Sequence, residues 1–399
     1  MEKIKRYCTY LKCLCKLIIA FIYVQLYKKT IYVNDIWLIQ EKHTEARDNG
    51  YCLFKYLRTK HPEINVYYSI TKGSVDLYKV ITLGNTVESG SITHYMYYLA
   101  AKYRIGSQQA AASPYPTDWV NRFKFLCRRD QKTIFLQHGI TCNAVPDLYY
   151  EKSQFDLFVC CAEPELRFVH DVLQYPLDKA KLLGFCRYDY LDNHTLGNTI
   201  LIMPTFRQWL VSKNVENDAT SDECLSFENS DYFKNYYALL TNKSLLKCLR
   251  AHNCNAVFYL HYALQSYSKV FLHCNNDVIR IADRYHNDVQ ELMIQSSAMV
   301  SDYSSVMFDF AYMGKPVIML QFDEEKYRNE HYASGYFDYT RDGFGPVYSN
   351  VDDTVQYLIQ LIENGFVMNK EYVDRVNCFF TLRDKNNCER NYNAICNLK

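Results

Sequence analysis

The chain has 399 residues, which is too long for one ordinary domain and suits two, each with its own buried core. Hydrophobic residues make up 49% and charged residues 22%, with 37 Tyr and 22 Phe, so the composition excludes a disordered chain. Lysine and arginine (45) nearly balance aspartate and glutamate (44), which excludes the one-sign charge excess of a nucleic-acid-binding protein, so any anion site must be local.

Sixteen cysteines are scattered through helical and strand-like stretches, and no cleavable secretory signal precedes them. Neither Cys13 with Cys15 nor Cys160 with Cys161 has the paired spacing of a zinc site. We therefore expect reduced thiols in the cytoplasm, and we expect neither a metal nor another cofactor.

The first thirty residues, 1–30, form a basic amphipathic segment. Their apolar stretch, around residues 17–26, is shorter than the run of about 20 residues that spans a bilayer. Two interpretations fit equally well: a helix in the plane of a membrane interface, with its basic residues on anionic headgroups, or a first helix packed on its own domain. The basic residues are Lys3, Lys5, Arg6, Lys12, Lys16, Lys28 and Lys29, and the apolar residues facing the membrane would be Ile18, Phe21, Ile22 and Leu26.

Short apolar runs then alternate with helical patterns, which is typical of βαβ units and parallel sheets. The strands expected in the first half are 36–39, 66–70, 103–105, 133–136, 157–161 and 181–184. The helices expected between them include 51–59, 92–102 and 163–173.

The pattern restarts after the polar stretch 192–198, which indicates a domain boundary near residue 195. The strands expected beyond it are 200–203, 257–261, 278–281, 298–301 and 317–320, and the helices are 232–250, 289–297, 304–313 and a closing helical region over 351–398. We therefore predict the α/β class, with two Rossmann-like parallel-sheet domains facing a central cleft. The predicted domains are 31–195 and 196–370, followed by a C-terminal helical segment, 371–399.

Ligands of such sheets bind outside the carboxyl ends of the strands. Polar residues stand at the ends of four of the expected strands, at 137–139, 204–207, 261 and 302–305. In the last of these motifs Ser304 and Ser305 fall in the first turn of a helix, where free N–H groups and the helix dipole favour an anion. We predict a phosphate site here, although an ordinary N-cap by Asp302 or Ser304 explains the motif when it stands alone.

Arg207 follows a strand and the Pro204-Thr205 turn, so its guanidinium can project over the sheet edge and offer a planar fork to phosphate. His261 ends a strand of the same domain and offers a second donor. Taken singly, Arg207 is more simply explained as an ordinary surface arginine and His261 as a structural histidine.

His138 ends a strand of the first domain and precedes Gly139, which allows a sharp turn and close approach of a ligand. A histidine at this position has the near-neutral pKa wanted of a general base. The alternative is a ring hydrogen-bonded inside a turn.

Together these motifs resemble the CDP-glycerol glycerophosphotransferase family of teichoic-acid polymerases and primases, the TagF/TagB-like enzymes. That family shows H-G-T, G-x-P-R-x-D, P-T-x-R, H-P and D-Y-S-S with F-D, and the resemblance runs from about residue 37 to about residue 345. Ile140, Cys186 and Tyr262 depart from the pattern but spare its charged and hydroxyl groups. The matching residues are His138-Gly139-Ile140, Gly184-Phe185-Cys186-Arg187-Tyr188-Asp189, Pro204-Thr205-Phe206-Arg207, His261-Tyr262, Asp302-Tyr303-Ser304-Ser305, Phe308-Asp309, Trp37, Asp48-Asn49-Gly50, Lys315-Pro316, Phe322-Asp323 and Tyr327.

The resemblance implies a GT-B-like fold and a phosphotransferase, in which an acceptor hydroxyl attacks the polyol-bearing phosphorus of CDP-glycerol or CDP-ribitol and CMP leaves. His138 would be the base in an N-terminal, acceptor-side domain, and the C-terminal domain would hold the nucleotide donor. The implied catalytic residues are His138, Arg207 and His261, the donor-binding residues are Arg207, His261, Asp302, Ser304 and Ser305, and the acceptor-side residues are Asp323 and Tyr327.

The acceptor implied is a teichoic-acid or capsular polymer or its lipid-linked primer, used by a cytoplasmic enzyme peripheral at the inner face of the cell membrane, with no nucleic-acid partner. The same residues leave open a nucleotide-sugar glycosyltransferase or epimerase of the GT-B fold, and a non-catalytic nucleotide-binding protein. Glycerol and ribitol donors are not distinguished by the sequence, nor are single addition and polymerisation.

Overall fold

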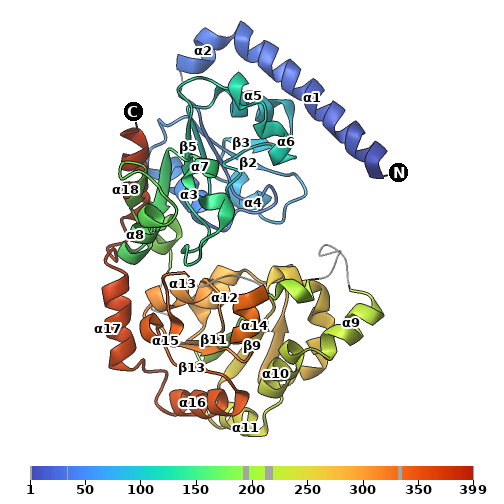
Figure 1. Ribbon diagram of the computed structural model, residues 1–399, viewed down its shortest axis with the longest axis vertical. Coiled ribbons are helices and arrows are strands. Elements are labelled where there is room, and N and C mark those ends of the chain that lie inside the picture. The colour runs from blue at the N-terminus through green and yellow to red at the C-terminus, as the bar shows by residue number, and fades with distance from the viewer. Residues whose placement is uncertain (1, 34, 192–196, 212–218, 331–334, 399) are drawn as a thin grey trace. The chain divides into compact units, whose positions relative to one another are not determined.

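A computed structural model describes residues 2–33, 35–191, 197–211, 219–330 and 335–398. The chain divides into two compact α/β units (Figure 1). Unit 1 comprises Met1–Ile140, Val145–Tyr190 and Leu382–Lys399, and unit 2 comprises Thr141–Ala144 and Leu191–Thr381. The boundary predicted near residue 195 lies within 192–196, outside the described residues.

Unit 1 holds a seven-stranded sheet in the order β3-β2-β1-β4-β5-β6-β7, with every strand parallel to its neighbours. Its short strands, fully or mostly buried in β1, β2, β4 and β6, are the apolar runs of the sequence, and only β3 was not predicted. The strand order reverses between β1 and β4, which places the ligand-binding position of a doubly wound sheet at their carboxyl ends. The strands are β1 (Trp37–Gln40), β2 (Val66–Ile70), β3 (Thr86–Glu88), β4 (Tyr103–Gly106), β5 (Lys132–Phe135), β6 (Leu157–Cys160) and β7 (Ala180–Leu182).

The helices between β1 and β7 connect successive strands, and η3 follows β7. They are α3 (Asn49–Lys60), α4 (Leu77–Ile81), α5 (Ile92–Ala100), α6 (Thr117–Asn121), α7 (Tyr150–Ser153) and α8 (Glu163–Asp171), with the 3₁₀ turns η1 (Lys124–Leu126), η2 (Pro146–Leu148) and η3 (Cys186–Asp189).

The N-terminal segment forms α1 (Glu2–Leu26) and α2 (Lys28–Val33), and α1 lies along α5 (Figure 1). One stripe of α1, which includes Leu17, Ala20 and Val24, is buried against Tyr98 and Leu99. The helix is longer than the apolar stretch seen in the sequence. Its part from Tyr7 to Leu26, with mean hydropathy 1.6, is long and apolar enough to cross a membrane, a criterion that a packed helix also meets.

Unit 2 holds a six-stranded parallel sheet in the order β10-β9-β8-β11-β12-β13. This is again a doubly wound order, and it reverses between β8 and β11. The sequence did not predict β13, which has only two half-buried residues. The strands are β8 (Thr199–Ile202), β9 (Asn255–Tyr259), β10 (Ile279–Ala282), β11 (Ala298–Ser301), β12 (Val317–Leu320) and β13 (Val347–Tyr348).

The long helix predicted over 232–250 is wrong, because two helices occupy this range. The Asn242 side chain accepts hydrogen bonds from the backbone N–H groups of Ser244 and Leu245 and so starts a new helix. The remaining elements up to residue 381 are η4 (Gln208–Leu210), α9 (Ser221–Glu228), α10 (Asp231–Leu240), α11 (Lys243–Ala251), η5 (Tyr262–Cys274), α12 (Val289–Gln295), α13 (Val306–Tyr312), α14 (Glu324–Glu330), α15 (Tyr339–Asp342), α16 (Val351–Glu363) and α17 (Lys370–Phe379).

The last helix, α18 (Asn387–Cys396), belongs to unit 1, where Asp189 binds its N-terminus. The Asp189 carboxylate accepts hydrogen bonds from the backbone and side-chain amides of Asn387 and from the backbone of Cys388. Gly184 has φ +76° and faces the same Asn387 side chain, so an added Cβ would collide with the Asn387 amide oxygen. The Gly184-to-Asp189 motif therefore anchors the end of the chain.

We expect Gly184→Ala to lower the free energy of unfolding by roughly 1–3 kcal/mol, because it combines a left-handed backbone with this collision. Urea denaturation followed by circular dichroism measures the loss. Gly73→Ala is the matched control, since an added Cβ there meets no described atom within 4 Å. Equal stability of the two variants would contradict the anchoring role.

Candidate active site

The carboxyl end of β5 carries His138 on a tightly held turn. Gln137 adopts a left-handed conformation with φ 59°, and its side-chain amide donates to the Val159 carbonyl at 2.6 Å and to Glu165 at 2.9 Å. Gln137 is buried, whereas His138 is exposed. The turn therefore presents the histidine at the sheet edge.

Asn49 fixes this turn from the other side. Its amide nitrogen donates to the carbonyls of Leu136, at 3.2 Å, and Gln137, at 2.8 Å, while its amide oxygen accepts from the Arg187 backbone at 3.0 Å. The buried Arg187 guanidinium in turn donates to Asp48 at 2.8 Å. The Asp48-Asn49-Gly50 and Gly184-to-Asp189 motifs thus meet beside His138.

The surroundings of His138 favour a neutral imidazole at neutral pH. Although the residue is exposed, the protein atoms around the ring lower the pKa of the imidazole by desolvation. The Asp48 carboxylate raises this pKa, and the Arg187 guanidinium lowers it further. A hydrogen bond to the backbone of Ser107 also favours the protonated form. A neutral histidine at a strand end is able to accept a proton.

Glu41, directly after β1, is a residue to which sequence analysis assigned no role. Its buried carboxylate accepts backbone N–H groups from Arg47 at 2.8 Å, Asp48 at 2.9 Å and Tyr51 at 2.7 Å. Burial is the main cause that raises the pKa of Glu41 to about 8, and the Asp48 charge adds to it. The one signal in the sequence that could have indicated Glu41 is its position directly after a predicted strand.

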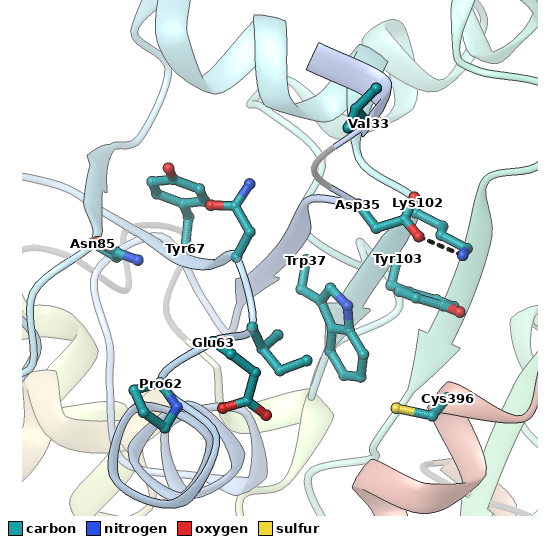
Figure 2. Close-up of a pocket in the computed structure, with 12 residues that line it drawn as sticks. Val33, Asp35, Trp37, Pro62, Glu63, Tyr67, Asn85, Lys102, Tyr103 and Cys396 are labelled. Atoms are coloured by element: carbon teal, nitrogen blue, oxygen red, sulfur yellow. Dashed lines mark hydrogen bonds and ion pairs between the residues drawn. The ribbon is translucent and has the colours of Figure 1, made fainter. Parts of the chain in front are cut away.

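A cavity of about 730 Å³ lies at the opposite, amino-terminal ends of β1 to β4. Figure 2 shows the Asp35 carboxylate against the Lys102 ammonium beside Trp37. The lysine in this cavity is therefore neutralised by a carboxylate. None of the predicted site residues lines it.

In unit 2, Arg207 lies at the point where the strand order reverses. Its side chain is fully buried, and Nη1 donates to Asp302 at 2.8 Å, while Nε and Nη2 donate to Asp323 at 2.7 and 3.0 Å. Asp302 also accepts from the Thr205 backbone at 2.8 Å. The expectation of an open guanidinium fork is wrong, because two carboxylates already occupy it.

Aromatic rings enclose this ion cluster. The guanidinium carbon of Arg207 lies 5.0 Å from the centre of the Tyr303 ring and 5.1 Å from that of Tyr327, and these two rings stack at 3.8 Å. Asp302 and Tyr327 are buried, and Asp323 is mostly so. Desolvation raises the pKa of Asp302, and the Arg207 charge opposes that shift. The structure therefore joins Arg207, Asp302, Asp323 and Tyr327 in one cluster.

The remaining predicted residues lie nearer the surface of the same sheet edge. Ser304 is half-buried and Ser305 is exposed, directly before α13, which begins at Val306 and not at residue 304 as predicted. The half-buried His261 accepts a hydrogen bond at Nδ1 from the Ala263 backbone, and its ring stacks on Phe206 at 4.7 Å. Hydroxyl and imidazole groups thus follow β11 and β9, the two neighbours of β8.

Comparison with known proteins identifies the family. A family model described as CDP-Glycerol:Poly(glycerophosphate) glycerophosphotransferase matches residues 21–397. The chain belongs to this family. The family predicted from the motifs is therefore confirmed.

Similar proteins include the minor teichoic acid biosynthesis protein GgaB of Bacillus subtilis, 32% identical over 371 residues, which are 91% of this chain and 40% of GgaB. The teichoic acid glycerol-phosphate transferase of Staphylococcus aureus is 32% identical over 106 residues, which are 27% of this chain and 26% of that protein. The chain thus spans at most about 40% of the length of these relatives.

Two groups of solved structures share the fold. The wall teichoic acid polymerase TagF has a TM-score of 0.67 and 16% identity, with 98% of this chain and 97% of that chain covered. The UDP-GlcNAc 2-epimerase from Neisseria meningitidis has a TM-score of 0.53 and 11% identity, with 90% and 99% covered. At these identities the likeness shows the fold alone, and the predicted GT-B-like α/β class is confirmed.

We expect Arg207→Met to lower the free energy of unfolding of unit 2 by about 3–5 kcal/mol, because it leaves the buried Asp302 carboxylate without its cation. Chemical denaturation measures this loss. Arg250→Met is the matched control, since Arg250 forms a similar two-bond pair with Asp277 but at an exposed surface. A stable Arg207→Met protein would show that the cluster does not hold the sheet edge together.

Proposed function

We propose that the chain transfers glycerol phosphate from CDP-glycerol to a hydroxyl of a cell-surface polymer or its lipid-linked primer and releases CMP. The observation that carries this proposal is the family match over residues 21–397. A TagF structure obtained after soaking with CDPG, similar to this chain at a TM-score of 0.66 and 17% identity, supports the choice of donor.

In this proposal His138 is the general base. An alcohol is a poor nucleophile at neutral pH, so the acceptor hydroxyl gives its proton to the imidazole while its oxygen attacks the polyol-bearing phosphorus. A new P–O bond forms, the P–O bond to CMP breaks, and CMP leaves with the electron pair. Gln137 and Asn49 support this role because they hold the turn that presents the ring.

Unit 2 then binds the donor. Ser304, Ser305 and His261 are the groups we assign to the phosphates, because they lie toward the surface after neighbouring strands. The buried Arg207, with Asp302, Asp323 and Tyr327, acts as a positioning group that holds the loops after β8, β11 and β12. In this assignment these four residues contact neither the donor phosphates nor the acceptor directly, unlike in the expectation from the sequence.

We further propose that the chain is peripheral at the inner face of the cell membrane through α1. A second stripe of this helix, which includes Leu11, Ile18, Ile22 and Leu26, is exposed, opposite the stripe packed on α5. The expectation that Phe21 faces the membrane is wrong, because Phe21 is half-buried and packs against the core of unit 1. An exposed apolar stripe with flanking lysines suits an interface rich in anionic lipid.

An assay of donors tests the function. The protein is incubated with CDP-glycerol, CDP-ribitol and a panel of UDP-sugars, together with cell-envelope extract, and nucleotide release is followed by chromatography. CMP release from a CDP-polyol with a mass increase of the acceptor supports the proposal. UDP release alone would favour a sugar transferase or epimerase, and CMP binding without turnover would indicate a non-catalytic protein.

We expect His138→Ala to lower turnover by about 100-fold or more with CDP-glycerol affinity retained, because only the base is lost. His286→Ala, at an exposed histidine paired with Asp283, is the control. An unchanged rate in His138→Ala rules out this base.

The pH profile gives a second measurement on the same group. Because the pKa of His138 is lowered from 6.5 and protonation disables a base, the acidic limb of kcat/KM should have its midpoint below pH 6.5. A midpoint above 6.5, or the same limb in His138→Ala, would contradict the assignment.

For the membrane proposal, we expect Ile22→Asp with Leu26→Asp to abolish co-sedimentation with anionic liposomes, because two charges enter the exposed stripe. Leu225→Asp, at another exposed leucine, is the control for a general loss of hydrophobic surface. Co-sedimentation equal to that of the unmodified protein would remove α1 as the contact.

A further inference from the structure

A separate cavity of unit 1, with a volume of about 350 Å³, is built around Arg104. This size is within the range of about 300–1,000 Å³ that is typical of small-molecule sites. Arg104 lies within β4 and Thr133, which also lines the cavity, lies beside it in β5. The cavity thus involves the strands themselves, and His138 does not line it.

The Arg104 side chain is buried without a counter-charge. The residue is 2% exposed, and its guanidinium lies 4.6 Å from the Tyr98 ring centre and donates from Nη1 to the Ser113 hydroxyl at 3.0 Å. Its Nε has no hydrogen-bond partner among the described residues. None of the described carboxylates forms an ion pair with it. A buried charge in this state is costly unless an anion pairs with it.

A second cation faces the same space. The residue is Lys124, which is itself exposed but lines the cavity; the pKa of its ammonium is lowered, chiefly by desolvation and also by the Arg104 charge, so the two cations repel each other. The carboxylates of Asp118 and Asp147 are also in the lining, and both residues are exposed at its rim; Asp147 pairs with Lys152 at 3.6 Å. Among the charged residues of the lining only Arg104 is buried, so the charge in the interior of the cavity is positive.

We propose that this cavity binds the phosphate group of a phosphate ester, with Arg104 and Lys124 as the charged contacts. The guanidinium fork suits phosphate oxygens, and the Thr117 hydroxyl and the Gln109 and Asn121 amides in the lining add neutral donors. This binding does not depend on the proposed transfer reaction, because it uses none of the residues assigned to that reaction.

Isothermal titration calorimetry on the full chain tests the proposal with three probes: inorganic phosphate, glycerol 3-phosphate as a monoester, and glycerophosphoglycerol as a diester. We expect at least one probe to bind, with affinity reduced roughly tenfold or more in Arg104→Met and less in Arg104→Lys, because loss of the charge removes charge-assisted hydrogen bonds. A preference for the monoester indicates a small metabolite, and a preference for the diester indicates a polymer segment; both support the site.

The matched control is Lys132→Gln, since Lys132 lies in β5 against Asp156 and does not line the cavity. Ser304→Ala with Ser305→Ala separates this cavity from the proposed donor site. Binding that is lost in the serine variant but retained in Arg104→Met overturns the proposal, as does the absence of binding by all three probes. If Arg104→Met fails to fold by circular dichroism, Lys124→Gln decides, and unchanged affinity in it overturns the proposal.

Discussion

The buried Arg207 guanidinium is the constraint on which the carboxyl edge of the second sheet depends. A buried cation among tyrosine rings is costly unless carboxylates pair with it in good geometry, and Asp302 and Asp323 supply them from the loops after β11 and β12. Because Asp302 also accepts from the Thr205 backbone, three loops are fixed around one charge. These bonds hold the loops of the edge together, which suits the positioning role proposed for Arg207.

In unit 1, neutral groups and not an ion cluster hold the turn at the carboxyl end of β5. The amides of Asn49 and Gln137 bind the turn before His138, and the nearest charges, Asp48 and Arg187, neutralise each other at 2.8 Å. Their opposite effects on the imidazole leave desolvation as the main cause of its lowered pKa. Holding the turn with neutral amides adds no charge beside the imidazole, which suits the general-base role proposed for His138.

The strands could largely be predicted because buried parallel strands are short apolar runs, and the site positions because they follow such runs. β3 and β13 could not be predicted, because they have only three and two residues, of which Val87 alone is buried, and so leave no periodic signal. The burial of Arg207 was also beyond prediction, because its two carboxylates come from residues 95 and 116 positions away in the chain. A motif gives the place of a side chain along a strand, but its partners are set by the order of strands in the sheet.

The other buried arginines differ from Arg104 because each of them has a carboxylate partner. Among the described residues, Arg128 pairs with Asp130, Arg187 with Asp48, and Arg207 with Asp302 and Asp323. The fold thus supplies a carboxylate wherever a buried guanidinium serves the structure alone. Arg104 is as deeply buried as these but has only a hydroxyl and a ring beside it. A buried cation without an anion lowers the stability of the fold. The ion-pair free energy that the fold does not gain is instead gained when a phosphate binds, which is why the unpaired Arg104 suits the proposed ligand site.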